Sequence, residues 1–267
     1  MKTIIPTPEI NAPAHDLVAS AHRPPLPDHW EQGITFIGED IFGTPASGEV
    51  ILEGVTTKSA ANAITDNGVE YTPFLIEVGV ARPAASYSDQ EREDIARRAI
   101  ERGQRYIIET AMYTGSVLGN QFLVDANSTT ISGGTYDPAA ALGALQTEFA
   151  RGGGQGTIYI SPILAEILSD RFEERDGKLW TTVRGDLVIV GSYGQTGPEA
   201  AAAGAGTEWM IGHLGIPCLL LSDIFVYDSF DHTNNEPVVR AERVAAVVWN
   251  PMQWAVVVDV VSTVLEP

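Results

Sequence analysis

The sequence predicts an α+β fold, in which one unusually long helix and two ordinary helices are combined with several strands. Helices and strands that follow one another in this order favour α+β over a repeating βαβ architecture. No internal repeat of roughly 20 to 50 residues is visible. The 267 residues are 44% hydrophobic and only 19% charged, a composition that supports a sizeable core in one large or two small domains.

Charge and cysteine usage exclude several classes of function. The chain has 16 basic and 35 acidic residues, and its formal net charge of −19 repels nucleic-acid backbones and anionic membranes. Sequence-specific DNA binding is therefore not expected. The single cysteine, Cys218, cannot form an intrachain disulfide or a thiolate zinc cluster, and its apolar neighbours favour a buried, inert thiol. No stretch resembles a signal sequence or a membrane span, so we expect a protein that stays soluble in the cell that makes it.

Residues 1–45 are expected to form an extended amino-terminal arm that contributes little to the core. Proline blocks a regular helix and favours a polyproline-like course. His15, His22 and His29 recur at intervals of seven residues, but the prolines break any helix that would align them, so no metal site is predicted there. The prolines are Pro6, Pro8, Pro13, Pro24, Pro25, Pro27 and Pro45.

Residues 46–87 have the pattern of a long β-hairpin. β-Branched residues occur in the runs 49–53 and 69–80, with polar residues between them. The tip, which includes Lys58, is too polar to be core, and the hairpin is too long for its tip to pack on its own domain. We expect it to pack on something else.

Residues 88–114 predict one long amphipathic helix. Ser88 and Glu91 fit a capping box, and no proline interrupts the next 26 residues or so, about 39 Å of helix. Five of the 16 basic residues of the chain, all arginines, lie in this helix. Three acid-first i,i+4 pairs are expected: Glu93–Arg97, Asp94–Arg98 and Glu101–Arg105. The predicted apolar stripe comprises Ala96, Ala99, Ile100, Gly103 and Ile107.

The second half of the chain predicts two capped helices and a series of strands. Asp137 begins a helix that Gly152 ends, and Ser161 begins a second that extends to residue 168, each with proline at its first position. The glycine-rich segment 194–206 is interpreted as a mobile loop. Strands are predicted at 157–160, 187–190, 218–226, 238–248 and 254–264.

No convincing active site is visible in the sequence. The glycines of 152–156 follow a helix and precede a strand, the reverse of a phosphate loop, and 191–194 lacks the spacing of a nucleophile elbow. The acidic segment 223–232 fits a solvated loop better than a cation site, because it has no Asp-x-Asp-x-Asp-Gly pattern. No catalytic residue, metal or cofactor is therefore predicted.

The segment 234–251, NNEPVVRAERVAAVVWNP, resembles the closing segment of tailed-phage major capsid proteins of the Hong Kong 97 type. In that family a strand with an acidic–arginine pair runs into an aromatic-x-Pro turn and a last strand. Here Glu242 and Arg243 match the pair. The segments TIYISP (157–162) and RGDLVIV (184–190) are similar to a strand-to-helix junction and the following strand of the family's axial domain. The order of elements also agrees along the whole chain.

This resemblance implies a fold, a function and partners. The expected protein is a major capsid protein that self-assembles as pentamers and hexamers into the icosahedral head shell of a double-stranded DNA bacteriophage, in the bacterial cytoplasm. A separate scaffolding protein is expected unless the sequence is the mature form, because the arm starts within a few residues of Met1. A portal, a decoration protein and DNA held without sequence specificity are further expected partners. The implied parts are an amino-terminal arm (1–45), an E-loop hairpin (46–87), a spine helix with part of the peripheral domain (88–135), an axial domain (136–226) and return strands of the peripheral domain (227–267).

Some members of this family join neighbouring subunits through a Lys–Asn isopeptide bond that a buried glutamate assists. Lys58 and Asn234 match the donor and the acceptor, but Ala241 stands at the position of the assisting acid. Loss of a general base typically costs roughly 10²- to 10⁴-fold in rate, so mature particles are expected to lack covalent cross-links. Glu242 and Arg243 are expected to point to opposite faces of a strand and to serve assembly or local folding. The expected assembly contacts are Lys58, Arg97, Arg98, Asn234, Glu242 and Arg243.

Three alternatives remain at this point. An encapsulin-like bacterial nanocompartment shell shares the fold and encloses an enzyme cargo, but cargo docking uses an amino-terminal helix, which seven prolines before residue 46 argue against. A head-decoration or adhesion protein and an α+β enzyme are the others. Particles of one to three subunits in size-exclusion chromatography would favour either of these two over a shell protein.

Overall fold

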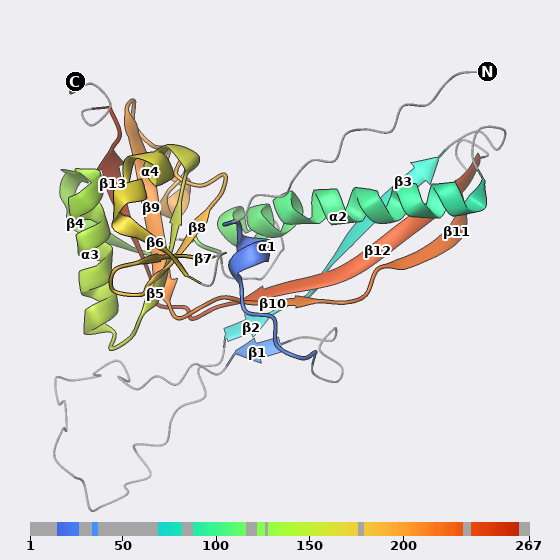
Figure 1. The fold of residues 1–267 in the computed structure, drawn as a ribbon, viewed down its shortest axis with the longest axis horizontal. Coiled ribbons are helices and arrows are strands. Elements are labelled where there is room, and N and C mark those ends of the chain that lie inside the picture. The colour runs from blue at the N-terminus through green and yellow to red at the C-terminus, as the bar shows by residue number, and fades with distance from the viewer. Residues whose placement is uncertain are drawn as a thin grey trace, which may run out of the picture.

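The computed structural model describes residues 15–26, 34–36, 69–81, 88–115, 122–125, 128–175, 179–231 and 236–261. They form an elongated molecule with two parts (Figure 1). We call the long helix together with the four-stranded sheet beneath it the limb, and the seven-stranded sheet with its two helices the body.

The limb is a helix-on-sheet layer organised around its longest strand. The limb consists of β3 (Phe74–Ala81), α2 (Asp89–Thr114), β10 (Cys218–Leu221), β11 (Phe225–Asp231) and β12 (Glu236–Val248). β3 pairs antiparallel along one edge of β12, and β11 and β10 pair antiparallel in succession along the other edge. α2 runs along one face of this sheet (Figure 1). The predicted strand 218–226 is therefore two strands, which pair with different stretches of β12.

The long helix has the predicted bounds and cap. The Ser88 amide donates to Glu91 Oε2 over 2.8 Å and the Glu91 amide donates to Ser88 Oγ, which is the expected capping box. Gly115 ends the helix in the left-handed conformation with φ of 70°. The predicted length of 26 residues is confirmed.

The side-chain pattern of α2 differs from the prediction. The buried stripe contains Ala96 and Ile100 as expected, but it continues through Gln104 and Ile108, whereas Ile107 is 36% exposed. Steps of four residues keep positions 96, 100, 104 and 108 over the sheet, and position 107 turns away from it. The three predicted i,i+4 ion pairs are absent from the ion pairs of the described residues, and Arg105 binds Asp16 instead of Glu101.

The body is built on a mixed sheet with the strand order β4–β13–β9–β5–β8–β7–β6. β4 is parallel to β13 and β5 is parallel to β8, and the other pairs are antiparallel. The strands are β4 (Thr129–Tyr136), β5 (Gly156–Ile160), β6 (Phe172–Arg175), β7 (Leu179–Thr182), β8 (Leu187–Val190), β9 (Thr207–Leu214) and β13 (Gln253–Asp259). The helices are α3 (Pro138–Arg151) and α4 (Pro162–Ile167).

Several of these elements match the predictions and four strands do not. Both helix caps are confirmed, since Asp137 accepts from the amides of Ala139 and Ala140 and Ser161 accepts from Leu164. The strands β4, β6, β7 and β9 were not predicted. β9 lies near the middle of the sheet, and seven of its eight residues are buried, so it lacks the alternation of polar and apolar residues that marks a half-exposed strand.

The two sheets divide the chain differently from the predicted boundaries. The predicted return segment 227–267 is shared, because β11 and β12 belong to the limb and β13 belongs to the body. The predicted segment 136–226 is shared as well, because its end forms β10 of the limb. Trp249, Asn250 and Pro251 carry the chain from the long central strand of the limb into the body sheet.

The amino-terminal segment corrects the expectation that residues 1–45 contribute little to the core. α1 (Leu17–Ser20) is a short helix capped by Asp16, and its Leu17 and Val18 are fully buried in the largest apolar cluster. Proline-rich sequence on both sides limits this helix to one turn but does not prevent it. Further along, β1 (Ile34–Phe36) pairs antiparallel with β2 (Val69–Tyr71).

Only the second run of the predicted hairpin lies within the described residues. This run, 69–80, is extended as expected, but it forms two strands: β2, which pairs with β1, and β3, which pairs with β12. The first run, 49–53, and the tip with Lys58 lie outside the described residues.

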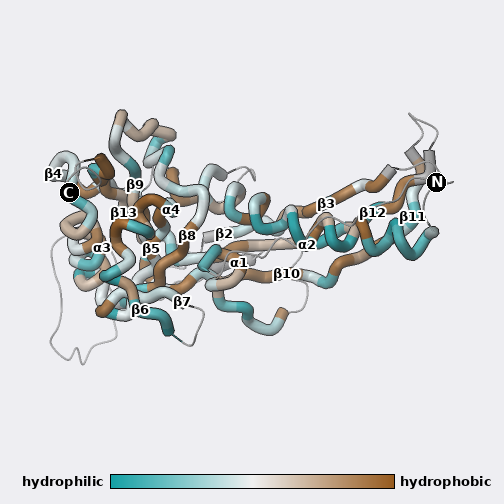
Figure 2. Tube along the Cα trace, turned by 45° about the horizontal axis from the view of Figure 1, so that its top comes forward, coloured by the Kyte–Doolittle hydropathy of each residue, from teal (hydrophilic) through white to brown (hydrophobic). Residues whose placement is uncertain are grey.

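The two faces of the body sheet bury separate apolar clusters. One cluster lies between the sheet and α3 and α4, and includes Phe149, Ile158 and Val256. The other lies on the opposite face, where Tyr159, Ile189 and Ile211 pack against α1 and the carboxyl end of α2. Figure 2 shows hydrophobic residues concentrated on the strands of the body and hydrophilic residues along much of α2. The body sheet is thus covered on both faces: by α3 and α4 on one side, and by α1 and the carboxyl end of α2 on the other.

Candidate assembly surfaces

One face of the limb sheet is left uncovered by the described residues. Val239 and Ala241 of β12 point to α2, where they pack with Ala96 and Ile100. Side chains alternate along a strand, so the intervening residues point the other way, together with their partners on β3 and β11. We call this side the outer sheet face. It comprises Leu75, Glu77, Phe225, Tyr227, Ser229, Val238, Arg240, Glu242 and Val244. Of these, Val238 is buried and Val244 packs against Leu220 and Ala246.

On the outer sheet face, the middle strand β12 carries the charged Arg240 and Glu242, and the exposed apolar side chains lie on the flanking strands β3 and β11. Leu75 is 53% exposed, Phe225 is 60% exposed and Tyr227 is 41% exposed. Single exposed apolar side chains are ordinary, but Phe225 and Tyr227 are neighbours on the same side of β11, and three large exposed apolar side chains on one sheet face are typical of an interaction surface. The face can therefore bury substantial apolar area against another molecule.

Charged groups on this face are arranged in pairs. Glu242 lies directly opposite Glu77 in the β12–β3 register, a repulsive placement that nearby donors offset. Arg240 forms an ion pair with Glu77, and the Tyr227 hydroxyl donates to Glu242. The hydrogen bond to Glu242 raises the pKa of Tyr227, because ionising the phenol would place a second negative charge beside the carboxylate.

Arg243 points to the opposite side of β12, as the alternation predicts. Its Nε donates to the carbonyl of Ser222 over 2.7 Å, and its Nη1 donates to Gln104 Oε1 on α2 over 2.7 Å. Burial lowers the pKa of the Arg243 guanidinium, and nearby Arg23 adds to this. These contacts tie helix, strand and turn together, so they favour the local-folding role; an assembly role for Arg243 stays a prediction.

Of the other four predicted assembly contacts, two lie on the surface of α2 and two lie outside the described residues. Arg97 and Arg98 are exposed on α2 and have no ion-pair partner among the described residues. Lys58 and Asn234 are not described, so the structure does not place the predicted cross-link pair. Ala241, at the position of the assisting acid, is fully buried beneath α2 and brings no carboxylate there.

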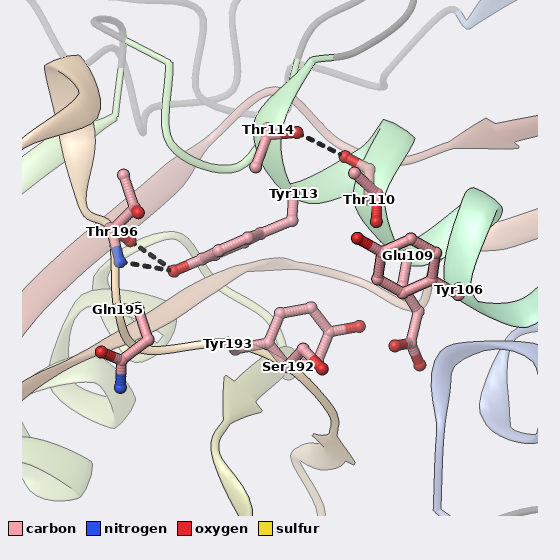
Figure 3. A pocket seen from close by; sticks show the side chains of 9 residues that line it. All are labelled: Tyr106, Glu109, Thr110, Tyr113, Thr114, Ser192, Tyr193, Gln195 and Thr196. Atoms are coloured by element: carbon pink, nitrogen blue, oxygen red, sulfur yellow. Dashed lines mark hydrogen bonds between the residues drawn. The ribbon is translucent and has the colours of Figure 1, made fainter.

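A small hollow of about 230 Å³ lies where α2 approaches the segment after β8 (Figure 3). Its lining includes Glu109 and three tyrosines, Tyr106, Tyr113 and Tyr193. The Tyr113 hydroxyl accepts from the amide of Gly194 over 3.0 Å and donates to the carbonyl of Thr196, which fixes the loop against the helix. No motif in the sequence marks this group, because its members come from distant segments.

The chemistry of the hollow is dominated by one half-buried acid, Glu109. Burial and the negative charge of Asp16 raise the pKa of Glu109 to about 7, against the opposing effects of the Leu17 amide and Arg105. Within the described residues, no group of three histidine, cysteine or acidic side chains is arranged to hold a metal ion. Among the helices of that same part, none is both long enough and apolar enough to span a lipid bilayer.

Comparison with known proteins gives matches among solved structures alone. No family model matches the chain, and no curated protein matches it. The capsid of an empty GTA particle is 9% identical with a TM-score of 0.57, over 97% of this chain and 95% of that chain. A structure from Mycobacterium phage Ogopogo is 14% identical with a TM-score of 0.53, over 97% of this chain and 96% of that one. The SrpI encapsulin complex from Synechococcus elongatus is 13% identical with a TM-score of 0.52, over 100% of this chain and 94% of that one.

These matches extend over both parts of the molecule, from the amino-terminal segment to the last strand of the body. At such low identities they establish the fold, and they agree with the architecture expected from the segment 234–251. The chain therefore has the α+β Hong Kong 97 type fold of phage capsids.

Proposed function

We propose that this chain is a major capsid protein, which self-assembles into the icosahedral head shell around the double-stranded DNA genome of a tailed bacteriophage. The fold carries the proposal, because capsids share it over 97% of the chain and at least 95% of their own length. The match of 234–251 to the closing segment of such proteins adds a sequence feature that the fold comparison does not use.

The physical character of the limb supports a shell subunit. Leu75 and Phe225 expose more than half of their surface on a sheet face that the described residues leave bare. An isolated subunit that keeps such a face in water is prone to association, whereas a closed shell covers it with a neighbour. A net charge of −19 also suits a container that must not bind its packaged DNA tightly to its wall.

The proposed assembly contacts follow from this function. In a shell of pentamers and hexamers, Glu242 on the outer sheet face and Arg97 and Arg98 on α2 are the described candidates for contacts with neighbours. Lys58 and Asn234 are candidates by sequence resemblance. A separate scaffolding protein, a portal and a decoration protein belong to the same proposal.

An encapsulin-like shell protein is the second candidate, because the SrpI encapsulin matches over the whole chain at a TM-score close to that of the phage structure. The two functions differ in what the particle encloses. A phage head protects double-stranded DNA from nuclease, and an encapsulin shell encloses a protein cargo.

Expression of the full chain, alone and together with a candidate scaffolding protein, tests the proposal. Electron microscopy and sedimentation are expected to show closed shells in the megadalton range, or open capsomers of five or six subunits. Particles purified from the native source are expected to contain nuclease-resistant DNA; protein cargo in place of DNA would select the encapsulin alternative. A stable species of one to three subunits under all these conditions would refute both shell functions.

A denaturing gel of boiled mature particles tests the expected lack of covalent cross-links. Ala241 cannot accept the proton that Lys58 must lose, and at neutral pH an unperturbed lysine with a pKa of about 10.4 is almost fully protonated. We expect a single band near 28.6 kDa. A ladder of multimers that the Lys58→Ala variant abolishes would overturn this expectation.

A further inference from the structure

Residues 15–22 cross the junction between body and limb as a short strap. At one end, the carbonyl of His15 accepts from the amide of Val190 on β8 over 2.8 Å. At the other end, the carbonyl of His22 accepts from the amide of Leu219 on β10 over 2.8 Å. The strap is therefore bonded to a body strand and to a limb strand.

The middle of the strap is anchored on α2. Leu17 and Val18 are fully buried in the apolar cluster at the junction. Asp16 accepts from the amide of Ala19 over 2.7 Å through Oδ1, and its Oδ2 forms an ion pair with Arg105. Asp16 itself is 2% exposed, so this ion pair is well shielded from water.

A second carboxyl group faces the strap one helical turn further along α2. Glu109 is subject to the charges of Asp16 and Arg105 and to the amide of Leu17. From the body, Tyr193 approaches the same place, and its buried hydroxyl has no hydrogen-bond partner (Figure 3). The charge of Arg105, which pairs with Asp16, thus also acts on Glu109, and desolvation disfavours the charged form of this half-buried second acid.

We propose that residues 15–22 form a proton-sensitive strap, which holds the body against the limb while Glu109 is neutral and loosens when Glu109 ionises. An ionised Glu109 places a second negative charge beside Asp16, with Arg105 left to compensate both. The other titratable groups around this site are His15 on the strap, Tyr113 on α2 and Tyr193 on the body. The proposal concerns the single subunit, so it goes beyond the shell function and can fail independently of it.

The direction of the pH effect follows from linkage. With the strap in place the pKa of Glu109 is about 7, and it moves toward the ordinary value of 4.5 when release exposes the carboxyl to water. The strapped state therefore binds more protons between these values, and a rise in pH through this window favours release. Each pKa unit is a factor of ten, so the released fraction increases by at most on the order of a hundredfold.

The single cysteine of the chain provides a native reporter. The backbone of His22 forms an isolated parallel β-bridge with that of Cys218, so the strap lies directly against the strand that carries the thiol. The experiment measures the rate at which a thiol reagent modifies Cys218 in the soluble, unassembled full chain, from about pH 5 to about pH 8. Dividing this rate by that of the denatured chain at each pH removes the titration of an unperturbed thiol. Burial raises the pKa of Cys218 in the folded chain, and this remaining effect is common to the wild-type and variant chains.

We expect the normalised rate to rise roughly tenfold or more across this range in the wild-type chain. The Glu109→Gln variant, which cannot ionise, should remain slow throughout, and the Glu101→Gln variant, an exposed site on the same helix, should behave like wild type. Asp16→Asn retains a capping side chain but removes the negative charge that acts on Glu109. In this variant the rise of the normalised modification rate should therefore be smaller and should occur at lower pH. Equal pH dependence in the wild-type and Glu109→Gln chains, with circular dichroism showing both folded, would overturn the proposal.

Discussion

The body and the limb bury their sheets to different extents. The body sheet has apolar clusters on both faces, and every residue of its strand β5 is buried. The limb sheet has α2 on one face, with a small cluster around Ala96, Ile100, Val239 and Ala241, while the outer sheet face exposes large apolar side chains. Stability should therefore depend mainly on the body, whereas the limb retains apolar area for association.

The largest effect on stability is expected from a core substitution in the body. Phe149 is fully buried, and Gly156 and Gly212 leave the space that its ring fills, since a Cβ at either position would lie within 2.6 Å of the ring. Phe149→Ala should reduce the free energy of unfolding by about 3–5 kcal/mol, because the site cannot collapse around a cavity of this size. Chemical denaturation of the unassembled chain measures this. A loss below about 1 kcal/mol would show that the body does not dominate stability.

Buried His213 in the body and half-buried Glu109 in the limb should give opposite pH dependences. His213 in the body donates from Nδ1 to the carbonyl of Leu214 and accepts from the Tyr159 hydroxyl at Nε2, and burial lowers its pKa from 6.5 to about 4. The folded state then binds fewer protons than the unfolded state, so the contribution of His213 is complete above about pH 6.5 and is lost as the pH falls toward 4, by roughly 3 kcal/mol. Glu109 acts in the reverse sense, since its pKa is raised to about 7 and its contribution is lost as the pH rises from 4.5.

Separate variants distinguish these two contributions. His213→Gln should remove the loss of unfolding free energy at acid pH, and Glu109→Gln should remove the loss of unfolding free energy at alkaline pH. Unfolding free energies at about pH 5 and about pH 8 provide the measurement. If neither substitution changes the slope of stability against pH, then these buried groups do not titrate as their surroundings indicate.

Neighbouring residues on β12 provide a smaller test within the limb. Arg243→Ala should cost about 1–3 kcal/mol, because the Ser222 carbonyl and Gln104 Oε1 lose a charged donor. Glu242→Ala, on the outer sheet face, should change the melting temperature little and impair assembly. Thermal melting of the unassembled chain and electron microscopy of assemblies separate the two roles. A large assembly defect with an unchanged melting temperature for Arg243→Ala would restore its predicted role at a subunit contact.

The sequence predicts local structure better than it predicts how distant segments meet. The cap at Ser88, the 26-residue helix and the alternation of Glu242 and Arg243 all follow from signals within a few residues. β9 was missed because a strand buried on both faces has no polar alternation, and the assignment of β13 to the body depends on long-range pairing. Likewise, nothing in the sequence around Asp16 indicates that Arg105 and Glu109 lie beside it.

The smallest effect on stability, together with a large effect on association, is expected on the outer sheet face. Leu75→Ser and Phe225→Ser each remove an apolar side chain that is more than half exposed, so each should change the free energy of unfolding by no more than about 0.5 kcal/mol. In an assembly that covers this face, the same substitutions remove buried apolar area, at about 25 cal/mol for each Å². Because a symmetric shell repeats every contact, a modest loss in each subunit accumulates over the particle.

Ile107→Ser is the matched control, since Ile107 is also an exposed apolar residue of the limb but lies on α2, away from the outer sheet face. Sedimentation of the three variants under assembly conditions should show wild-type particles for Ile107→Ser and a shift to small species for Leu75→Ser and Phe225→Ser. Normal particles from both sheet variants would mean that the bare face of the limb stays in contact with water in the shell. The exposed face of the limb sheet would then reflect only how the subunit folds. The contacts between subunits would lie on other surfaces, and the region around Arg97 and Arg98 on α2 would be the first to test.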